Sequence, residues 1–128
     1  MSARLLAQAC VALNNANKSN KRQVLIRNVN STVIRFFTLM QAKGYIAEMN
    51  LIKDKRVQKL IINLTGRLNK CMAISPNYDL RKDEIEQFRA SVLPARQFGH
   101  LILHTTKGMM DHTECTGKIG GKVLGYFF

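Results

Sequence analysis

Two neighbouring stretches near the middle of the chain alternate apolar and polar residues, and this alternation constrains the fold most strongly. Residues 57–64 place Leu60, Ile62 and Leu64 on one face, and residues 46–53 alternate in the same way. In residues 46–53 the alternating apolar residues are Ala47, Met49 and Leu51. Successive side chains of a strand point to opposite faces, so the pattern predicts a β-hairpin that turns at 54–56.

The rest of the first half predicts two helices and one more strand. Apolar residues recur at helical spacing over 2–17, where Ser2 is a candidate N-cap, and again over 31–43. Asn30 or Ser31 is the expected cap of the second helix, and Gly44 is its expected stop. A short strand is expected at 21–27. Residues 1–64 are therefore expected to form a lobe in the order α-β-α-β-β.

The second half predicts a different lobe, separated from the first by a polar break at 63–69. Its final segment, 122–128, carries no charged side chain after Lys122 and is expected to be a buried strand. The other expected elements are strands at 69–74 and 98–105, turns at 75–77 and 107–108, a helix at 82–93 and a helical turn at 110–114. The fold class is thus α+β with two small lobes, an N-terminal α-β-α-β-β lobe at 1–64 and a C-terminal, mostly β lobe with short helices at 65–128.

The charge of the chain is strongly positive and unevenly distributed. Twenty Lys and Arg stand against eight Asp and Glu, a net charge of +12. Residues 1–64 hold eleven of these cations and two acids, whereas residues 65–128 hold nine cations and six acids. A small basic protein typically binds a polyanion, because its cations release the counterions condensed on phosphates. The alternative is a basic face that only keeps the protein soluble. The basic clusters of the first half are Lys18, Lys21, Arg22 and Arg27; Arg35 and Lys43; and Lys53, Lys55, Arg56 and Lys59.

Catalytic, metal and disulfide motifs are weak. His112 and Cys115 have usable zinc spacing, but no second ligand pair repeats it. Asp111 and His112 are adjacent, yet no nucleophile is placed beside them. Three widely spaced cysteines, at 10, 71 and 115, favour free thiols in a reducing compartment. We therefore expect no enzymatic activity, no metal, no cofactor and no membrane segment.

A second candidate for RNA contact is the short segment His104-Thr105-Thr106-Lys107-Gly108. Hydroxyl side chains beside a glycine can approach a base edge or a ribose closely, and each can both donate and accept. The alternative is an ordinary turn at the end of a strand. Because the six Phe mostly belong to apolar patterns, contacts with sugar, phosphate and RNA shape are favoured over base stacking.

Several motifs, in order along nearly the whole chain, resemble the universal small-subunit ribosomal protein eight family in its eukaryotic and archaeal branch. These are TGRLNKC at 65–71 followed by ISP at 74–76, LPARQFG at 93–99, TTKGMMDH at 105–112, and GGKVLGYF at 120–127. KRQVLIR at 21–27 and GYI at 44–46 also fit this family.

The resemblance implies a two-lobe protein without catalytic activity that binds the central domain of small-subunit ribosomal RNA. Family members recognise an irregular helix there and help the RNA to fold during assembly. The loop matching residues 104–108 reads that helix, and the loop matching residues 28–31 adds contacts from the first lobe. The chain departs from the family at three places: no proline or lysine at 28–31, His104 as the first loop residue, and the segment 115–118.

The predicted function is a structural constituent of the small ribosomal subunit that acts in translation, in the cytoplasm, with nucleolar assembly in a eukaryote. The expected partners are the ribosomal RNA and neighbouring small-subunit proteins, without a membrane or a homo-oligomer. A messenger-RNA-binding translational regulator with the same surface is the first alternative. A nucleic-acid-modifying enzyme and a basic membrane-surface protein are the others. The predicted RNA-binding residues are Lys21, Arg22, Asn30, Ser31, Lys55, Arg56, Arg67, Asn69, Lys70, Arg96, Gln97, His104, Thr105, Thr106, Lys107, Gly108, Lys118, Gly120, Gly121 and Lys122.

Overall fold

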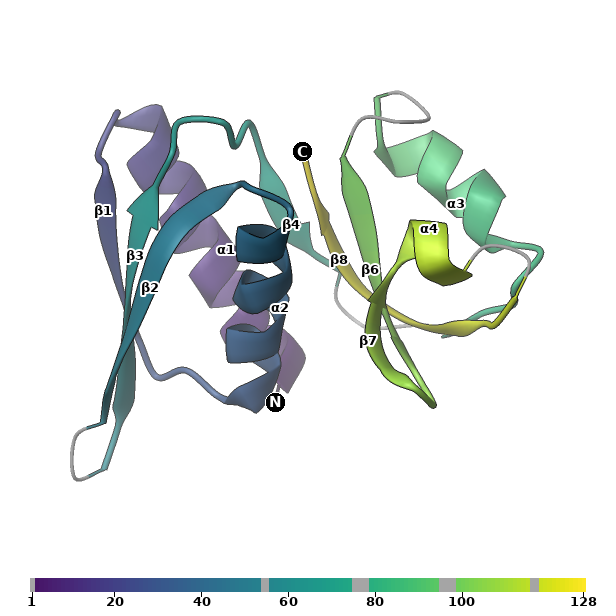
Figure 1. The fold of residues 1–128 in the computed structure, drawn as a ribbon, viewed down its shortest axis with the longest axis horizontal. Coiled ribbons are helices and arrows are strands. Elements are labelled where there is room, and N and C mark those ends of the chain that lie inside the picture. The colour runs from purple at the N-terminus through teal and green to yellow at the C-terminus, as the bar shows by residue number, and fades with distance from the viewer. Residues whose placement is uncertain (1, 54–55, 75–78, 95–98, 116–117) are drawn as a thin grey trace.

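The computed structural model describes residues 2–53, 56–74, 79–94, 99–115 and 118–128, with side chains from Leu5 onward. Two antiparallel sheets divide the molecule into two lobes (Figure 1). One has the strand order β1-β3-β2; the other has β4-β8-β6-β7, and β5 also pairs with β8. The elements are α1 (Ser2–Lys18), β1 (Gln23–Arg27), α2 (Ser31–Ala42), β2 (Ile46–Lys53), β3 (Gln58–Leu64), β4 (Cys71–Ala73), β5 (Asp79–Leu80), α3 (Ile85–Val92), β6 (His100–Thr105), β7 (Gly108–Asp111), α4 (His112–Cys115) and β8 (Gly121–Phe127). The predicted α+β class with two lobes is confirmed.

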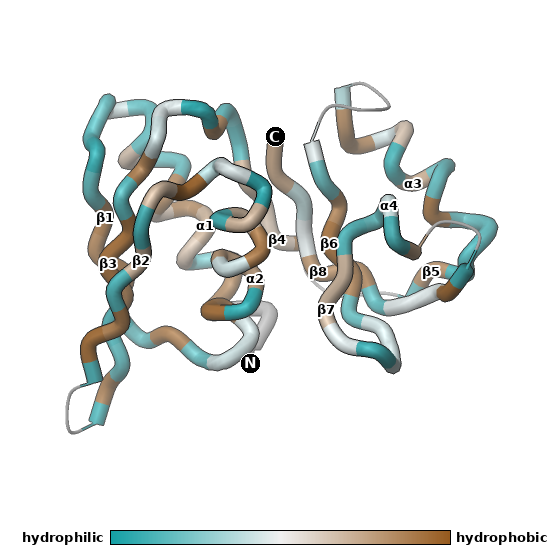
Figure 2. The backbone as a smooth tube through the Cα atoms, in the orientation of Figure 1, coloured by the Kyte–Doolittle hydropathy of each residue, from teal (hydrophilic) through white to brown (hydrophobic). Residues whose placement is uncertain are grey.

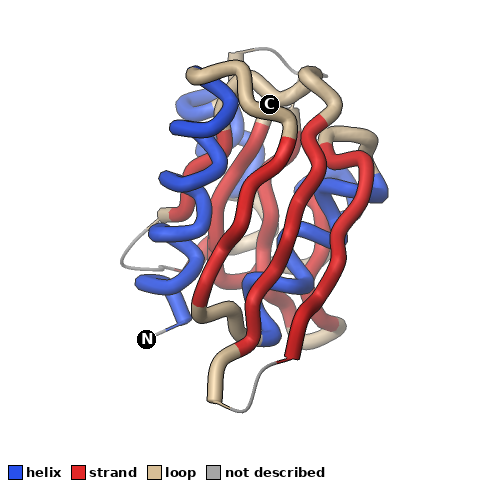
Figure 3. The backbone as a smooth tube through the Cα atoms, turned by 90° about the vertical axis from the view of Figure 1, so that its left-hand side faces the viewer, coloured by secondary structure: helices blue, strands red, loops and turns tan. Residues whose placement is uncertain are grey.

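The first lobe has the predicted order of elements. The Asn30 side-chain oxygen accepts the Val33 N–H at 3.0 Å and caps α2, and the chain leaves the helix through Gly44 at a φ of +86°. Helices α1 and α2 cover one face of the three-stranded sheet, and the other face is open (Figure 3). Phe36, among others, is completely buried under α2. Burial of this one face explains the period of two in β3.

The hairpin contains a bulge that the alternation did not reveal. Ile46 pairs with Leu64 and Glu48 pairs with Asn63, so Ala47 has no partner of its own in β3. Beyond the bulge Met49 pairs with Ile62 and Leu51 with Leu60, so the expected alternation holds there. At the start of the strand, however, Ile46 is buried and Ala47 is exposed. The predicted alternation of Ala47 with Met49 and Leu51 therefore fails at Ala47 alone, since one inserted residue moves a side chain to the other face.

The second lobe is built around β8, which lies between β4 and β6. Its central residues are buried, as predicted for the final strand. The helix expected at 82–93 is shorter, since α3 covers only Ile85–Val92. Residues 108–111 form strand β7, so the helical turn begins at His112 rather than at 110. The short strand β5 was not predicted, and the turn expected at 75–77 lies outside the described residues.

One of the two hydrophobic clusters extends across both lobes. Phe127 of β8 packs edge-on against Phe36 and Tyr45, with ring centroids 5.9 and 5.1 Å apart. The side chain of Asn14 in α1 donates to the Cys71 carbonyl at 2.6 Å and accepts the Cys71 N–H at 2.9 Å. Separating the lobes would expose these apolar and polar groups together, so the core opposes independent lobe movement. We keep the division into residues 1–64 and 65–128 as a proposal.

Two global expectations concern thiols and membranes. Cys10, Cys71 and Cys115 are free and buried. Burial raises the pKa of the Cys115 thiol. Among the described helices, none has the length and hydropathy needed to cross a bilayer.

Candidate nucleic-acid interface

The loop predicted to read RNA, residues 104–108, connects β6 and β7. It forms an exposed and hydrophilic turn, called the reading turn below (Figure 2). Thr105 is buried, and its hydroxyl donates to the Gly108 carbonyl at 2.9 Å and accepts the Lys107 N–H at 3.1 Å. Thr106 and Lys107 are exposed. The structure therefore gives the two threonines different roles: Thr105 shapes the turn from inside, and Thr106 presents its hydroxyl to solvent.

Gly108 is required by the backbone of this turn. Its φ is +110°, a region that side chains with a Cβ rarely adopt, and no atom lies within 4 Å of the position of an added Cβ. The turn thus combines a backbone position that favours glycine with free space above it. That space is what close approach by a bulky ligand needs.

Gly120 and Gly121, at the start of the final strand, have a packing role. A Cβ on Gly121 would lie 2.8 Å from the His104 carbonyl oxygen, and one on Gly120 would lie 2.6 Å from the Leu80 carbonyl oxygen. Lys122 is exposed and pairs with the exposed His104 across the sheet. Residues opposite each other in an antiparallel pair share a face, so these two side chains can contact one ligand. Lys118 is also exposed.

The first lobe presents a groove between the start of α2 and the outer end of the β2–β3 hairpin. Its volume is about 710 Å³, and Asn30, Ser31 and Arg56 line it together with Lys53. The rest of the lining consists of two polar side chains, Asn28 and Gln58, and the aliphatic side chains Leu5, Val29, Ile34, Leu51 and Val57. Three of the predicted residues are therefore brought together. The Asn30 side-chain oxygen is already used by the helix cap, so the other polar residues, Ser31, Lys53 and Arg56 among them, offer groups to a ligand.

A second, more polar pocket of about 550 Å³ brings Lys21 and Arg22 together with Thr65 and Gly66. Arg67 lies elsewhere. Its guanidinium covers the Tyr45 ring at 4.7 Å and donates to the Lys43 carbonyl at 3.1 Å. This arrangement gives Arg67 a structural role in joining the linker to α2. Asn69 and Lys70 are exposed next to it, whereas Lys55, Arg96 and Gln97 lie outside the described residues.

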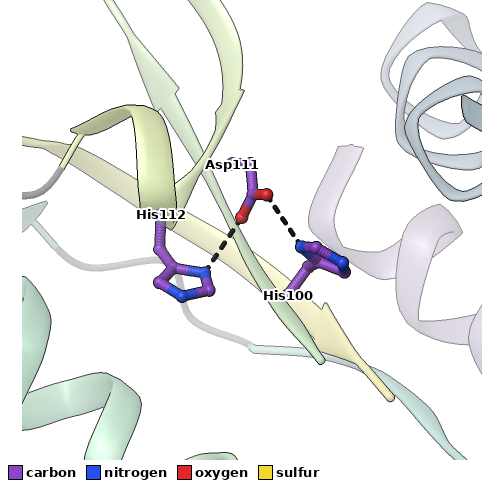
Figure 4. Close-up of side chains that lie close together, drawn as sticks. All are labelled: His100, Asp111 and His112. Atoms are coloured by element: carbon purple, nitrogen blue, oxygen red, sulfur yellow. Dashed lines mark hydrogen bonds and ion pairs between the residues drawn. The ribbon is translucent and has the colours of Figure 1, made fainter. Parts of the chain in front are cut away.

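His100 of β6, Asp111 of β7 and His112 of α4 form a compact cluster (Figure 4). The buried Asp111 carboxylate is 2.7 Å from His100 Nδ1, 2.9 Å from His112 Nδ1 and 3.4 Å from the Lys43 ammonium. Burial alone would raise the pKa of Asp111, but the hydrogen bonds and charges of the two histidines outweigh it and hold that pKa well below its usual value. The carboxylate is thus ionised, and its contacts link β7 to β6 and to the end of α2.

Side chains of these types can ligate a metal, but their surroundings fit hydrogen bonding better. His112 Nδ1 already lies between two protein groups, the Leu101 backbone nitrogen at 3.1 Å and the Asp111 carboxylate at 2.9 Å, so this ring nitrogen faces the protein. The Lys43 ammonium beside Asp111 would also repel a divalent cation. Cys115, the ligand suggested by sequence spacing, is not a member of this cluster. We therefore assign the cluster a structural role.

The acids concentrated at residues 83–86 are partly paired within their own segment. Glu84 accepts from Arg81 at 3.0 Å, and Glu86 accepts from Arg89 at 2.9 Å. Both are i,i+3 pairs at the start and along α3. They serve the scaffold of the second lobe.

Comparison with known proteins places these features in a family. The family model described as Ribosomal protein S8 matches residues 5–128. The small ribosomal subunit protein uS8 of Eremothecium gossypii and uS8A of Saccharomyces cerevisiae are each 48% identical over 125 residues. In both comparisons 97% of this chain and 96% of the relative are covered. The members of this family are structural components of the ribosome and not enzymes. The resemblance seen in the sequence is confirmed, and the chain belongs to the ribosomal protein S8 family.

Proposed function

We propose that this protein is a structural constituent of the small ribosomal subunit that binds the central domain of the ribosomal RNA and supports its folding. The exposed, internally braced turn with Thr106 at its tip carries the proposal. Family membership and the names of the two relatives, both small ribosomal subunit proteins, support it.

The turn can recognise RNA because its polar groups are held before binding. The bonds made by Thr105 fix the backbone from Thr105 to Gly108, so Thr106 and Lys107 project from a defined hairpin end. A short side chain on such a frame loses little conformational freedom when it binds. A hydroxyl can donate to, or accept from, a base edge or a ribose 2′-OH in the wide minor groove of RNA.

The first lobe would supply attraction that does not depend on sequence. Lys53 and Arg56 in the groove, and Lys21 and Arg22 in the polar pocket, are long cationic side chains near the surface. Such cations neutralise phosphates and fix the position of the protein on a helix without reading bases. The proposed partners are thus small-subunit ribosomal RNA and neighbouring small-subunit proteins, and the proposed location is the cytoplasm, with assembly in the nucleolus if the source is eukaryotic.

Sedimentation of a tagged copy in a cell lysate tests the proposal. We expect the protein to cofractionate with small subunits and to protect the central domain of their RNA in a crosslinking footprint. A protein that remains at the top of the gradient, or whose footprint falls only on messenger RNAs, would contradict it. The second result would favour the translational regulator instead.

A further inference from the structure

A shallow groove runs between the lobes next to the reading turn. Arg35, Thr38 and Leu39 of α2 line one side, and Gly108 and Met109 of β7 line the other, enclosing about 360 Å³. Helix α2 and strand β7 flank this groove from the two lobes (Figure 1). Arg35 was not among the predicted binding residues, although it belongs to a basic cluster of the sequence.

The side chains along the groove follow matching spacings. Arg35, Leu39 and Lys43 are four residues apart and lie on one face of α2 and its C-cap, about 6 Å apart along the axis. On β7, Met109 and Asp111 are two residues apart and lie on one face, about 6.7 Å apart. Two successive pairs therefore join the elements: Leu39 beside Met109 at the groove, and Lys43 with Asp111 at 3.4 Å.

The Lys43–Asp111 pair is well anchored. The Asp111 side chain is completely buried and also accepts from His100 at 2.7 Å and from the Thr113 hydroxyl at 3.1 Å. Lys43 is held from the other side, because the Arg67 guanidinium bonds its carbonyl. The pair thus sets the distance between α2 and β7 at the closed end of the groove.

Arg35 lies one turn of α2 before Leu39, and this spacing places it opposite the reading turn. Arg35 is exposed, and among the described residues no acid lies within salt-bridge distance of it. Its guanidinium is therefore available to a phosphate, for which its planar, multiple donors are suited.

We propose that Arg35 binds a phosphate of the same RNA helix that Thr106 reads, so that one recognition site spans both lobes. The Lys43–Asp111 pair positions the two halves of this site. The inference rests on the proposed RNA-binding function and names a residue that deepens it. An RNA helix that contacts the turn and Arg35 together is selected by shape, because both contacts form only at one spacing.

Equilibrium titrations of Arg35→Gln test the direct contact. The probes are a hairpin RNA carrying the irregular helix of the central domain, and a perfect duplex of equal length and charge. We expect about a tenfold loss of affinity for the hairpin and about a twofold loss for the duplex. The matched control is Arg27→Gln, an exposed arginine on the far edge of the first sheet, which should lower both affinities by about twofold or less. Equal effects of the two substitutions on both RNAs would overturn the proposal.

The positioning role of the ion pair has its own signature. Lys43→Met removes a positive charge and Asp111→Asn removes a negative one, so direct electrostatics would weaken RNA binding in the first variant and strengthen it in the second. Positioning predicts that both variants lose about fivefold in affinity for the hairpin, that the double variant loses no more, and that Lys43→Arg restores binding.

Opposite effects of the two substitutions would refute positioning. If Asp111→Asn does not fold, the Lys43→Met variant and its rescue by Lys43→Arg decide, because the Lys43 side chain is partly exposed and tolerates exchange. A wild-type protein with no preference for the hairpin over the duplex would instead contradict the proposed function itself. The two failures are therefore distinguishable.

Discussion

The two lobes would meet RNA with different kinds of side chain. The first lobe offers long, flexible cations beside its two pockets, with Arg56 and Lys53 at the hairpin and Arg22 at the opposite end of the sheet. The second lobe offers a turn whose backbone is fixed by the Thr105 hydroxyl and whose exposed groups are short. Long cations act over the Debye length, about 8–10 Å at physiological salt, whereas a hydroxyl acts only within about 3 Å.

This difference teaches how a small protein can separate attraction from selection. Cations that rearrange freely gain a similar free energy from any polyanion, so they raise affinity for all RNAs. A fixed hydroxyl gains only where a partner lies at the right place, so it discriminates. The shared core around Phe127 holds the two surfaces in one arrangement.

The largest expected effect is that of Gly108→Val. Valine at a φ of +110° is strained and would also fill the open space above the turn. We expect a loss of about 100-fold in affinity for the irregular hairpin RNA, roughly 2.7 kcal/mol. Titration measures the affinity, and urea unfolding of the same variant is the control for general destabilisation. A loss of affinity no larger than the unfolded fraction accounts for would show that destabilisation, and not the turn, explains the effect.

The next effect is that of Thr106→Ala. The substitution removes one directed hydrogen bond without disturbing the internal bonds of Thr105, so about 1–2 kcal/mol of binding free energy to the hairpin should be lost. Binding to a perfect duplex should hardly change. Thr106→Ser keeps the hydroxyl and should bind like the wild type. An equal loss on both RNAs would mean that the turn does not discriminate.

A smaller and non-selective effect is expected for the double variant Lys55→Ala and Arg56→Ala. Removal of two cations should weaken binding to all RNAs by the same factor. The slope of log affinity against log salt, about 3 to 5 for the wild type, should fall by roughly 2. Isothermal titrations between low and moderate salt measure both quantities. A selective loss for the hairpin, with an unchanged salt slope, would reverse the roles that we assign to the lobes.

The smallest effect concerns acid stability. The pKa of Asp111 is lowered in the fold, so its ionised form stabilises the protein above its unfolded pKa near 3.8. This contribution is lost as the pH falls below that value. Asp111→Asn should therefore be less stable than the wild type at pH 4.5, and the difference should shrink toward pH 2.5. Urea unfolding at both pH values measures it, and Asp79→Asn, which alters an exposed carboxylate, serves as the control. A difference that does not change with pH would contradict the lowered pKa.

The sequence by itself determined the order of elements in the first lobe and the family. The signals for this order are local, and each depends on a few neighbouring residues. They are the alternation at Leu60, Ile62 and Leu64, the helix cap at Asn30 and the helix stop at Gly44. The basic charge and the motifs at 65–71 and 93–99 are likewise properties of the chain alone. These signals were sufficient to predict two lobes and a buried final strand.

Only the tertiary structure decided which polar groups remain available for binding. The Thr105 hydroxyl is used inside the turn, Arg67 covers Tyr45, and Asp111 is buried among histidines and paired with Lys43. Each of these depends on an element distant in the sequence or on the exact strand pairing, as does the bulge at Ala47. Periodicity reports which face of an element is buried, because burial repeats with the element. It does not report the partner of a single polar atom, since that partner is set by the packing of one lobe against the other.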